Sequence, residues 1–184
     1  QGISRRSFLQ FCSLTAASLG LGSAGAQEIA QALGLQEHCE GGMFREVFRS
    51  VVRTHATKQR RAATSIFYLL RGKEISRWHM VKSDEIWMYH AGSPAIQLLL
   101  LPDGTFEERI IGPDVLGGEF PQSLVPAWTW QSTVLLDRSE ESWGLFGAVV
   151  CPGFEYEDYV EGSADELMQR YPEAKDRILE LGLV

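Results

Sequence analysis

The chain has 184 residues, of which 45% are hydrophobic and 22% charged, a composition typical of one soluble globular domain with its own core. Its formal net charge of −7 and sequence pI near 5.1 argue against a nucleic-acid groove, because such a groove needs clustered Lys and Arg to displace counterions from phosphates. The three cysteines have no Cys-x-x-Cys spacing, so they predict neither a structural zinc site nor a disulfide framework, and they leave open a single Cys39–Cys151 bridge.

Residues 1–26 have the pattern of a targeting segment. Arg5 and Arg6 precede a mildly apolar run over residues 11–21, and residues 24–26, Ala-Gly-Ala, form a small-residue cleavage site. The run is too short to span a bilayer, so we expect no stable membrane insertion. The segment resembles the twin-arginine export signals of nickel–iron hydrogenase small subunits, which implies a periplasmic protein. Without a functional signal the protein would be cytoplasmic, and the segment would be an amphipathic helix that packs on the domain.

The domain that follows, residues 27–184, opens with a short helix predicted over residues 27–35. Gly41 and Gly42 come next, and paired glycines permit positive φ and a close backbone approach. They are compatible with either a plain turn or a ligand-binding loop. Residues 43–53 are rich in β-branched and aromatic side chains and predict a long strand.

Residues 72–92 are the stretch around which we expect the fold to be organised. Their period-two alternation predicts two strands joined by a polar turn at residues 82–84, hence a hairpin. If Glu85 points the same way as His79, an imidazole and a carboxylate meet across the strand pair. His90 falls on the face opposite Glu85, and we expect it outside any pocket.

A buried strand is predicted over residues 63–70, before the hairpin, and several short strands follow it. They cover residues 95–101, 105–111, 123–125, 130–136 and 143–150. Eight or more short strands separated by turns are typical of a β-sandwich or barrel. Two short helices, predicted over residues 164–171 and 172–181, are expected to cap the barrel or a subunit contact.

His79 and Glu85 are the residues to which we assign chemistry. An imidazole with a carboxylate suits Zn, Fe, Mn or Ni, and the same two groups can serve as base and acid without a metal. The alternative is that His79 only hydrogen-bonds Glu85 in a polar interior. The tryptophans leave a similar choice, between aromatic walls around a ligand and core packing. They are Trp78, Trp87, Trp128, Trp130 and Trp143.

The spacing of these residues resembles the first motif of the cupin superfamily, G-x5-H-x-H-x3-E-x6-G. The match is carried by His79, Glu85 and Gly92, with Val81 where the motif has its second His. Residues 126–131, P-A-W-T-W-Q, are similar to the second motif, P-x-G-x2-H. Two of the usual four metal ligands are therefore missing.

In the second motif, Trp128 stands at the Gly and Gln131 at the His. Four further blocks narrow the resemblance to a branch of small cupins of unsettled function. They read H-C-E-G-G at 38–42, S-D-E-I-W at 83–87, V-P-A-W-T-W-Q at 125–131 and C-P-G-F-E-Y-E-D at 151–158. The resemblance implies an all-β double-stranded β-helix, the cupin jelly roll, with short terminal helices. It also implies a homodimer that exchanges or abuts its N-terminal strands.

The resemblance places a small-molecule pocket inside the barrel, and sugar-nucleotide epimerases share the superfamily. We therefore expect an isomerase or epimerase acting on a carbohydrate-like or carboxylated substrate. His79 would abstract a proton with Glu85 orienting it, and Arg45 or Gln131 would stabilise the developing oxyanion. The expected substrate contacts are Glu40, Arg45, Trp87, Tyr89 and Gln131.

Two alternatives stay open. The first is a non-catalytic module that binds a metabolite, which the missing metal ligands favour. The second, a metal-dependent oxygenase, is weaker, since such chemistry generally uses more imidazole ligands. If His79, Glu85 and Gln131 do bind a divalent metal, we expect a weakly held ion with water completing the shell, because an amide oxygen is neutral.

Overall fold

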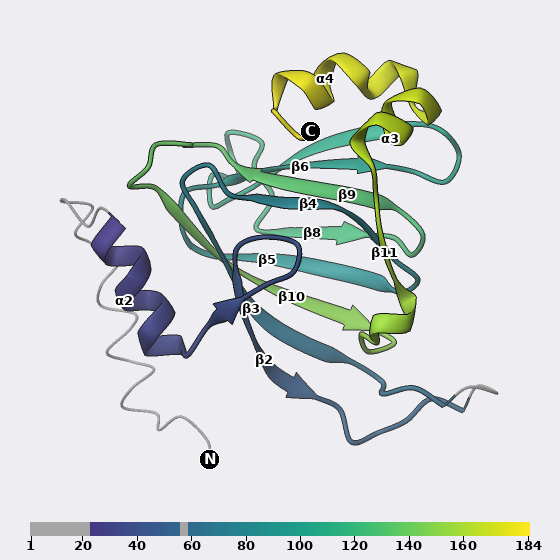
Figure 1. Cartoon of the computed structure of the whole chain (residues 1–184). Coiled ribbons are helices and arrows are strands. Elements are labelled where there is room, and N and C mark those ends of the chain that lie inside the picture. The colour runs from purple at the N-terminus through teal and green to yellow at the C-terminus, as the bar shows by residue number, and fades with distance from the viewer. Residues whose placement is uncertain (1–22, 56–58) are drawn as a thin grey trace.

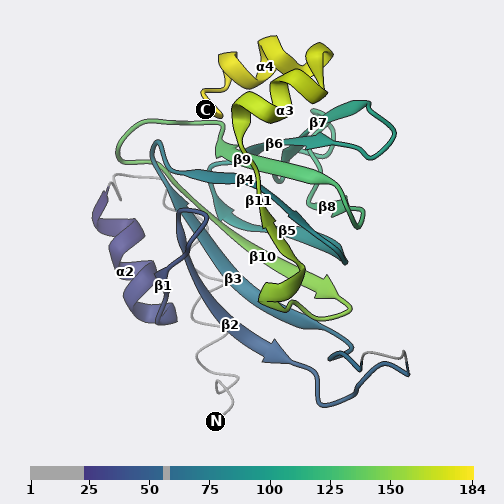
Figure 2. The ribbon, with the colours of Figure 1, turned by 45° about the vertical axis from the view of Figure 1, so that its right-hand side comes forward.

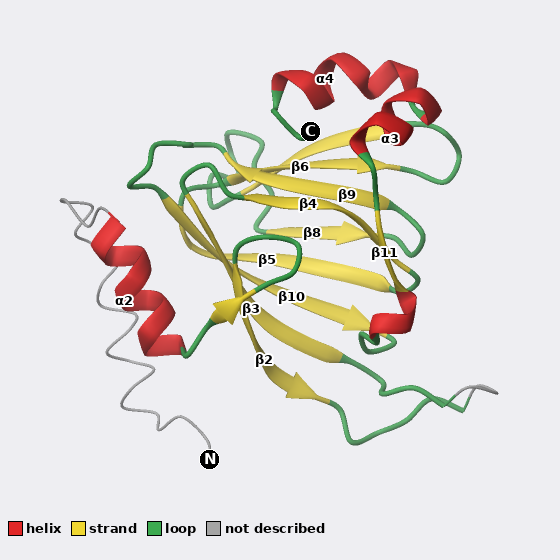
Figure 3. Cartoon of the chain, viewed as in Figure 1, coloured by secondary structure: helices red, strands yellow, loops and turns green. Residues whose placement is uncertain are grey.

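The computed structural model describes residues 23–55 and 59–184, which form two antiparallel β-sheets packed face to face, with helices near both ends of the chain (Figure 1 and Figure 3). This arrangement confirms the predicted all-β sandwich with short terminal helices. Most of the predicted targeting segment, together with Cys12, lies outside the described residues.

The first sheet has six strands in the order β1-β2-β3-β10-β5-β8. Their bounds are β1 Gln36–Glu37, β2 Met43–Arg49, β3 Thr64–Arg71, β10 Trp143–Cys151, β5 Asp84–Gly92 and β8 Gln122–Val125. The second sheet has five strands in the order β11-β4-β9-β6-β7. Their bounds are β11 Tyr159–Glu161, β4 Ile75–Val81, β9 Trp130–Leu135, β6 Ala95–Leu100 and β7 Phe106–Ile111. The predicted strands are thus present, and the one expected over residues 43–53 ends earlier, at Arg49.

Strands β4 and β5 are present as predicted, but they do not form a hairpin. β4 pairs with β9 and β11 in one sheet, and β5 pairs with β10 and β8 in the other. The chain therefore crosses from sheet to sheet at Lys82 and Ser83. His79 and Glu85 consequently meet across the space between the sheets, where both line one cavity, and not across a strand pair.

Part of the space between the sheets is filled by apolar side chains. This core cluster contains Tyr68, Leu70, Trp87, Ala95, Leu99, Ile111, Val125, Leu135 and Phe146, all buried. Beside it the interior is polar, with Gln97, Gln131 and Ser123 also buried. The candidate site lies next to these residues, around the buried side chains of Glu40, His79 and Glu85.

Helices cover the outer faces of both sheets (Figure 2). Helix α2, Ser23–Leu33, packs on the six-stranded sheet through Ala30, Leu69 and Leu145. The predicted cleavage site at residues 24–26 falls inside this helix, and Ala26 is buried. Among the described residues no helix is long and apolar enough to cross a membrane.

The C-terminal helices cover the outer face of the five-stranded sheet. They are α3 Ala164–Arg170, the 3₁₀ turn η2 Pro172–Ala174 and α4 Lys175–Glu180, with a second 3₁₀ turn, η1 Tyr156–Asp158, before β11. Trp78 packs in the core cluster beneath the helices, and its indole N–H donates to the carbonyl of Leu183 at 2.9 Å. Cys39 and Cys151 are both free thiols, so the bridge left open by the sequence does not form.

Candidate functional site

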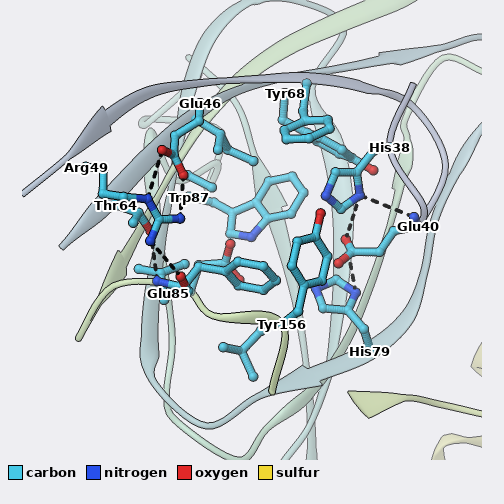
Figure 4. Close-up of a pocket in the computed structure, with 16 residues that line it drawn as sticks. His38, Glu40, Glu46, Arg49, Thr64, Tyr68, His79, Glu85, Trp87 and Tyr156 are labelled. Carbon is cyan, nitrogen blue, oxygen red and sulfur yellow. Dashed lines mark hydrogen bonds and ion pairs between the residues drawn. The ribbon is translucent and has the colours of Figure 1, made fainter. Parts of the chain in front are cut away.

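A cavity of about 100 Å³ lies between the two sheets, beside the apolar core (Figure 4). Strands β2, β3, β4, β5 and β10, the loop before β2 and the loop after β10 all contribute side chains to its wall. Its ionisable residues are His38, Glu40, Glu46, Arg49, His79 and Glu85, and its larger aromatic rings are Phe44, Tyr68, Trp87, Phe154 and Tyr156. The interior pocket expected from the sequence is therefore present.

The loop between β1 and β2 brings His38 and Glu40 into the cavity, and two glycines fix its path. Gly41 and Gly42 have φ of +99° and +70°, a region that glycine adopts without steric cost. A Cβ atom on Gly41 would overlap the carbonyl oxygen of Ile75. The two glycines thus form a tight turn that lies against strand β4 at Ile75, and this turn positions the side chains of His38 and Glu40 in the cavity.

Glu40 lies between two imidazoles. Its Oε2 is 3.4 Å from Nδ1 of His79 and 3.7 Å from Nδ1 of His38, and the Ser76 hydroxyl approaches it at 3.5 Å. Burial raises the pKa of Glu40 to about 8, although Ser76 and the charge of Arg77 oppose the shift. Glu40 is therefore mostly protonated at neutral pH, and it can donate a proton.

Both imidazoles are neutral at pH 7. Burial lowers the pKa of His38 to about 4 and also lowers that of His79, against the attraction of Glu85. His79 Nδ1 is 2.8 Å from the carbonyl oxygen of Arg77, so Nδ1 carries the proton and Nε2 keeps its lone pair. His38 Nδ1 instead accepts the backbone N–H of Glu40 at 3.2 Å. His79 can accept a proton at Nε2, whereas His38 presents an N–H at Nε2.

Glu85 is the second buried carboxyl group. Burial raises its pKa, while His79 and a hydrogen bond from Gln131 favour the charged form. Gln131 Nε2 donates to Glu85 Oε2 at 2.5 Å. The buried indole N–H of Trp87 also favours the charged form from nearby, but it has no hydrogen-bond partner among the described residues. It remains available to a ligand.

Arg45, predicted to contact an anionic substrate group, lies on the other face of β2. Its guanidinium carbon is 6.0 Å from the centre of the Phe67 ring, outside the cavity. Glu46 and Arg49 line the cavity instead, joined by an ion pair of 2.7 Å. The pairing of β2 with β3 is irregular between Glu46 and Phe48, which puts two residues three positions apart on the same side.

Of the other predicted contacts, Glu40 and Trp87 line the cavity, whereas Tyr89 and Gln131 do not. Tyr89 lies farther along β5, and its hydroxyl donates to a backbone carbonyl 2.7 Å away. Gln131 is buried behind Glu85 and supports it. His90 is exposed and outside the cavity, as expected.

Sequence reasoning assigned no role to His38 or to the aromatic residues after β10. His38 opens the H-C-E-G-G block, and its position two residues before Glu40 in a tight loop was the available signal. Phe154 and Tyr156 follow β10 and form part of the cavity wall, and Tyr156 is 68% exposed at its mouth. Trp87 is the only tryptophan in that wall among the described residues, so the others serve packing or the surface.

Trp128 keeps a glycine conformation at the position where the second cupin motif has Gly. Its φ is +68°, and its backbone N–H donates to the carbonyl of Val81 at 2.9 Å. The ring is about half exposed, with the Lys82 ammonium 5.6 Å from its centre. The backbone path of the motif is thus retained although the side chain differs.

The residues present do not fit the metal centre that the cupin fold implies. Val81 offers no ligand atom, and Gln131 turns its N–H toward Glu85 while its oxygen accepts a hydrogen bond from Gln97 at 3.4 Å. Within residues 23–55 and 59–184 no group of three or more His, Cys, Asp or Glu could hold a metal ion. The set of His79, Glu85 and Gln131 is therefore a hydrogen-bonded arrangement and not a ligand set.

A family model described as "Cupin superfamily (DUF985)" matches residues 27–160. The Saccharomyces cerevisiae protein named "Uncharacterized protein YML079W" is 31% identical over 139 residues, which cover 68% of this chain and 69% of the yeast protein. A solved structure from Shewanella oneidensis is similar with a TM-score of 0.76 and 31% identity, covering 85% of this chain and 96% of that chain. Oxalate decarboxylase from Bacillus subtilis, at 17% identity and a TM-score of 0.50 over 79% of this chain and 36% of its own, shares the fold alone.

The N-terminus is similar to a different protein. The uptake hydrogenase small subunit of Azotobacter vinelandii is 70% identical over 33 residues, which are 18% of this chain and only 9% of that subunit. The match touches the N-terminal segment, where the twin-arginine-like pattern lies.

Proposed function

The chain belongs to the cupin superfamily, in the family described as DUF985, and from this premise we propose that it is an isomerase or epimerase that moves a proton on a small carbohydrate-like substrate. The observation that carries the proposal is a proton donor and a proton acceptor on one buried cavity. Glu40 holds a proton at neutral pH, and Nε2 of His79 has a free lone pair.

In this proposal His79 Nε2 takes a proton from the carbon next to a substrate carbonyl. The electron pair of that C–H bond forms an enediol, and Glu40 gives its proton to the carbonyl oxygen. Glu85, as a carboxylate, stabilises the imidazolium that forms at His79. For an epimer, His79 returns its proton to the same carbon on the other face of the turned enediol, and ionised Glu40 takes back the proton of the oxygen it had protonated. For an isomer, His79 gives its proton to the former carbonyl carbon, and Glu40 takes the hydroxyl proton on the carbon that first lost its hydrogen, where the new carbonyl forms. Glu40 thus takes the role expected of Arg45 or Gln131.

The size and charge of the cavity favour a small neutral substrate over a carboxylated one. A volume of about 100 Å³ holds roughly seven to ten water-sized volumes, well below the few hundred Å³ of sites for drug-sized ligands. Arg49 is held by Glu46 at 2.7 Å and by Glu155 at 3.2 Å, so a substrate carboxylate would have to displace these partners. A short polyol with a carbonyl group fits these constraints.

Exchange of carbon-bound hydrogen tests the proposal whatever the product is. The protein would be incubated in D₂O with a panel of small aldoses, ketoses and hydroxy acids, and loss of C–H signals followed by NMR. We expect exchange for at least one sugar, reduced about 10²-fold or more in His79→Gln and in Glu40→Gln. His90→Gln, a histidine outside the cavity, is the matched control and should exchange normally. If no compound exchanges, or His79→Gln exchanges like the wild type, the proposal is wrong.

The second candidate is a non-catalytic module that holds a metabolite. The presence of Val81 and Gln131 at two metal-ligand positions of the motifs favours it. Saturable binding of a panel compound without hydrogen exchange over long incubation would support this function and remove the first. Oxygenase chemistry finds no ligand set among the described residues, and we do not propose it.

We also propose that two copies of the chain form a homodimer through their N-terminal strands. β1 and β2 form one edge of the six-stranded sheet, and β1 is only two residues long. Apolar side chains are exposed on and after β2, with Phe48 at 53% and Val51 at 87% exposure. An edge strand with exposed apolar side chains readily pairs with another chain.

A further inference from the structure

Five side chains form a continuous chain of hydrogen bonds from the protein surface to the cavity, which we call the relay. Arg109 Nη1 donates to Ser123 Oγ at 3.3 Å, and Ser123 donates to Gln97 Oε1 at 2.6 Å. Gln97 Nε2 donates to Gln131 Oε1 at 3.4 Å, and Gln131 Nε2 donates to Glu85 Oε2 at 2.5 Å. The residues come from five different strands, so the relay connects both sheets.

All four hydrogen bonds of the relay run in the same direction. Ser123, Gln97 and Gln131 each accept from the Arg109 side and donate toward Glu85, and all three are buried. Turning over either amide would leave two acceptors or two donors facing each other, which is costly in a buried site. The guanidinium of Arg109, which also pairs with Glu107 and donates to the Leu124 carbonyl, therefore stands at one end of a series of aligned dipoles, and a carboxyl group stands at the other.

We propose that the relay supplies to Glu85 the positive pole that a metal ion supplies in cupins whose motifs keep their histidines. Gln131 occupies the position of the His in the second cupin motif. Its side-chain N–H donates to Glu85, whereas the His of the motif would bind a metal ion. Hydrogen bonds to a charged acceptor are stronger than neutral ones, and bonds in series polarise one another. Arg109 and the relay thus oppose the rise in the pKa of Glu85 that burial causes, and they favour its carboxylate form without a metal ion.

The relay acts on Glu85 together with the other groups that surround it. Burial raises the pKa of Glu85, His79 on β4 lowers it by the attraction of its positive form, and Gln131 and Trp87 also lower it. Glu40, from the β1–β2 loop, raises it. Glu40 lines the same cavity. Apart from the two histidines, its carboxyl group has only one side-chain contact among the described residues, a weak hydrogen bond of 3.5 Å from the Ser76 hydroxyl. Glu85 accepts the last hydrogen bond of the relay, whereas Glu40 lies between two imidazoles. The relay therefore favours the charged form at Glu85, and Glu40 is the proton carrier of the proposed function.

The first test is the titration of the Glu85 side chain, followed by its ¹³C carboxyl NMR signal in the full chain without substrate. Gln131→Leu should raise the pKa of Glu85 by about one unit or more. Gln97→Met should raise this pKa by less, and Ser123→Ala should raise it least. Thr133→Val is the matched control, because it removes a buried hydroxyl without a hydrogen-bond partner on the same strand as Gln131. Its midpoint should be that of the wild type.

The relay is refuted if Gln97→Met and Ser123→Ala, folded by their amide spectra, titrate like the wild type, or if Thr133→Val shifts equally. The second test is calorimetric titration of the wild type with Mn²⁺, Co²⁺ and Zn²⁺. No binding that depends on His79 is expected, whereas one equivalent of metal lost in His79→Ala would overturn the proposal. Both tests need no turnover, so a failed exchange experiment would remove the proposed function and leave the relay standing.

Discussion

Replacing Glu40 by Gln should change how the stability of the protein depends on pH. Glu40 has an ordinary pKa of 4.5 and a pKa of about 8 in the fold, because burial disfavours its charged form. Between these values the folded protein keeps a proton that the unfolded chain has lost. The free energy of unfolding must therefore fall as the pH rises, and the variant lacks this contribution.

The size of the effect follows from the two pKa values. From pH 6.5 to pH 8 the Glu40 contribution lowers the free energy of unfolding by about 2 kcal/mol. His38 and His79 have lowered pKa values and act in the opposite sense, mainly below pH 6.5, and Glu85 acts in the same sense as Glu40. Their contributions are common to both proteins and cancel when the wild type and Glu40→Gln are compared.

Urea unfolding followed by tryptophan fluorescence at several pH values measures this difference. Between pH 6.5 and pH 8 the free energy of unfolding of the wild type should fall by about 2 kcal/mol more than that of Glu40→Gln. Glu140→Gln, at an exposed glutamate, is the control and should follow the wild type. Parallel profiles for the wild type and Glu40→Gln would show that Glu40 is ionised in the fold, and they would remove the proton donor from the proposed mechanism.

Three further predictions concern the loop, the signal and the assembly. Gly41→Ala should lower the free energy of unfolding, measured in urea, by about 3 kcal/mol or more, and Gly104→Ala should lower it by about 1 kcal/mol. Both glycines have positive φ, but only Gly41 lies against a backbone carbonyl. Equal losses in the two variants would show that this close approach is unimportant. Arg5→Lys with Arg6→Lys, which keeps the charge, should retain the full chain in the cytoplasm of a bacterial host on cell fractionation, and unchanged periplasmic export would refute the twin-arginine interpretation. Phe48→Glu should halve the mass measured by light scattering, whereas a wild-type monomer would exclude the homodimer.

The sequence predicts the strands well because their alternating and apolar patterns are local. It does not predict which strands pair, since His79 and Glu85 keep the same spacing whether their strands form a hairpin or cross between sheets. The motif spacing identifies His79 and Glu85 as cavity residues in either case. The pairing is decided by burial of the apolar core, which brings together segments far apart in the chain.

The details of the site were harder to predict because irregular backbone changes which side chains face inward. In β2 the irregular pairing with β3 brings Glu46 and Arg49 to the cavity in place of Arg45. In β4 a similar irregularity between Ser76 and His79 lets both reach Glu40, although strict alternation would separate them. Such irregularities depend on partner strands, and a single strand's sequence carries little sign of them.

Because the chain crosses between the sheets at Lys82 and Ser83, the distance between the two sheets determines how His79 and Glu85 are placed relative to each other. His79 and Glu85 lie on opposite sheets, so the apolar side chains packed between the sheets set the distance between them. Phe146 is one of these core side chains and is fully buried. Replacing such a core side chain by a smaller or a larger one would change the alignment of the imidazole and the carboxylate without altering either group. The reactivity of the cavity can thus be tuned by purely apolar substitutions in its neighbouring core.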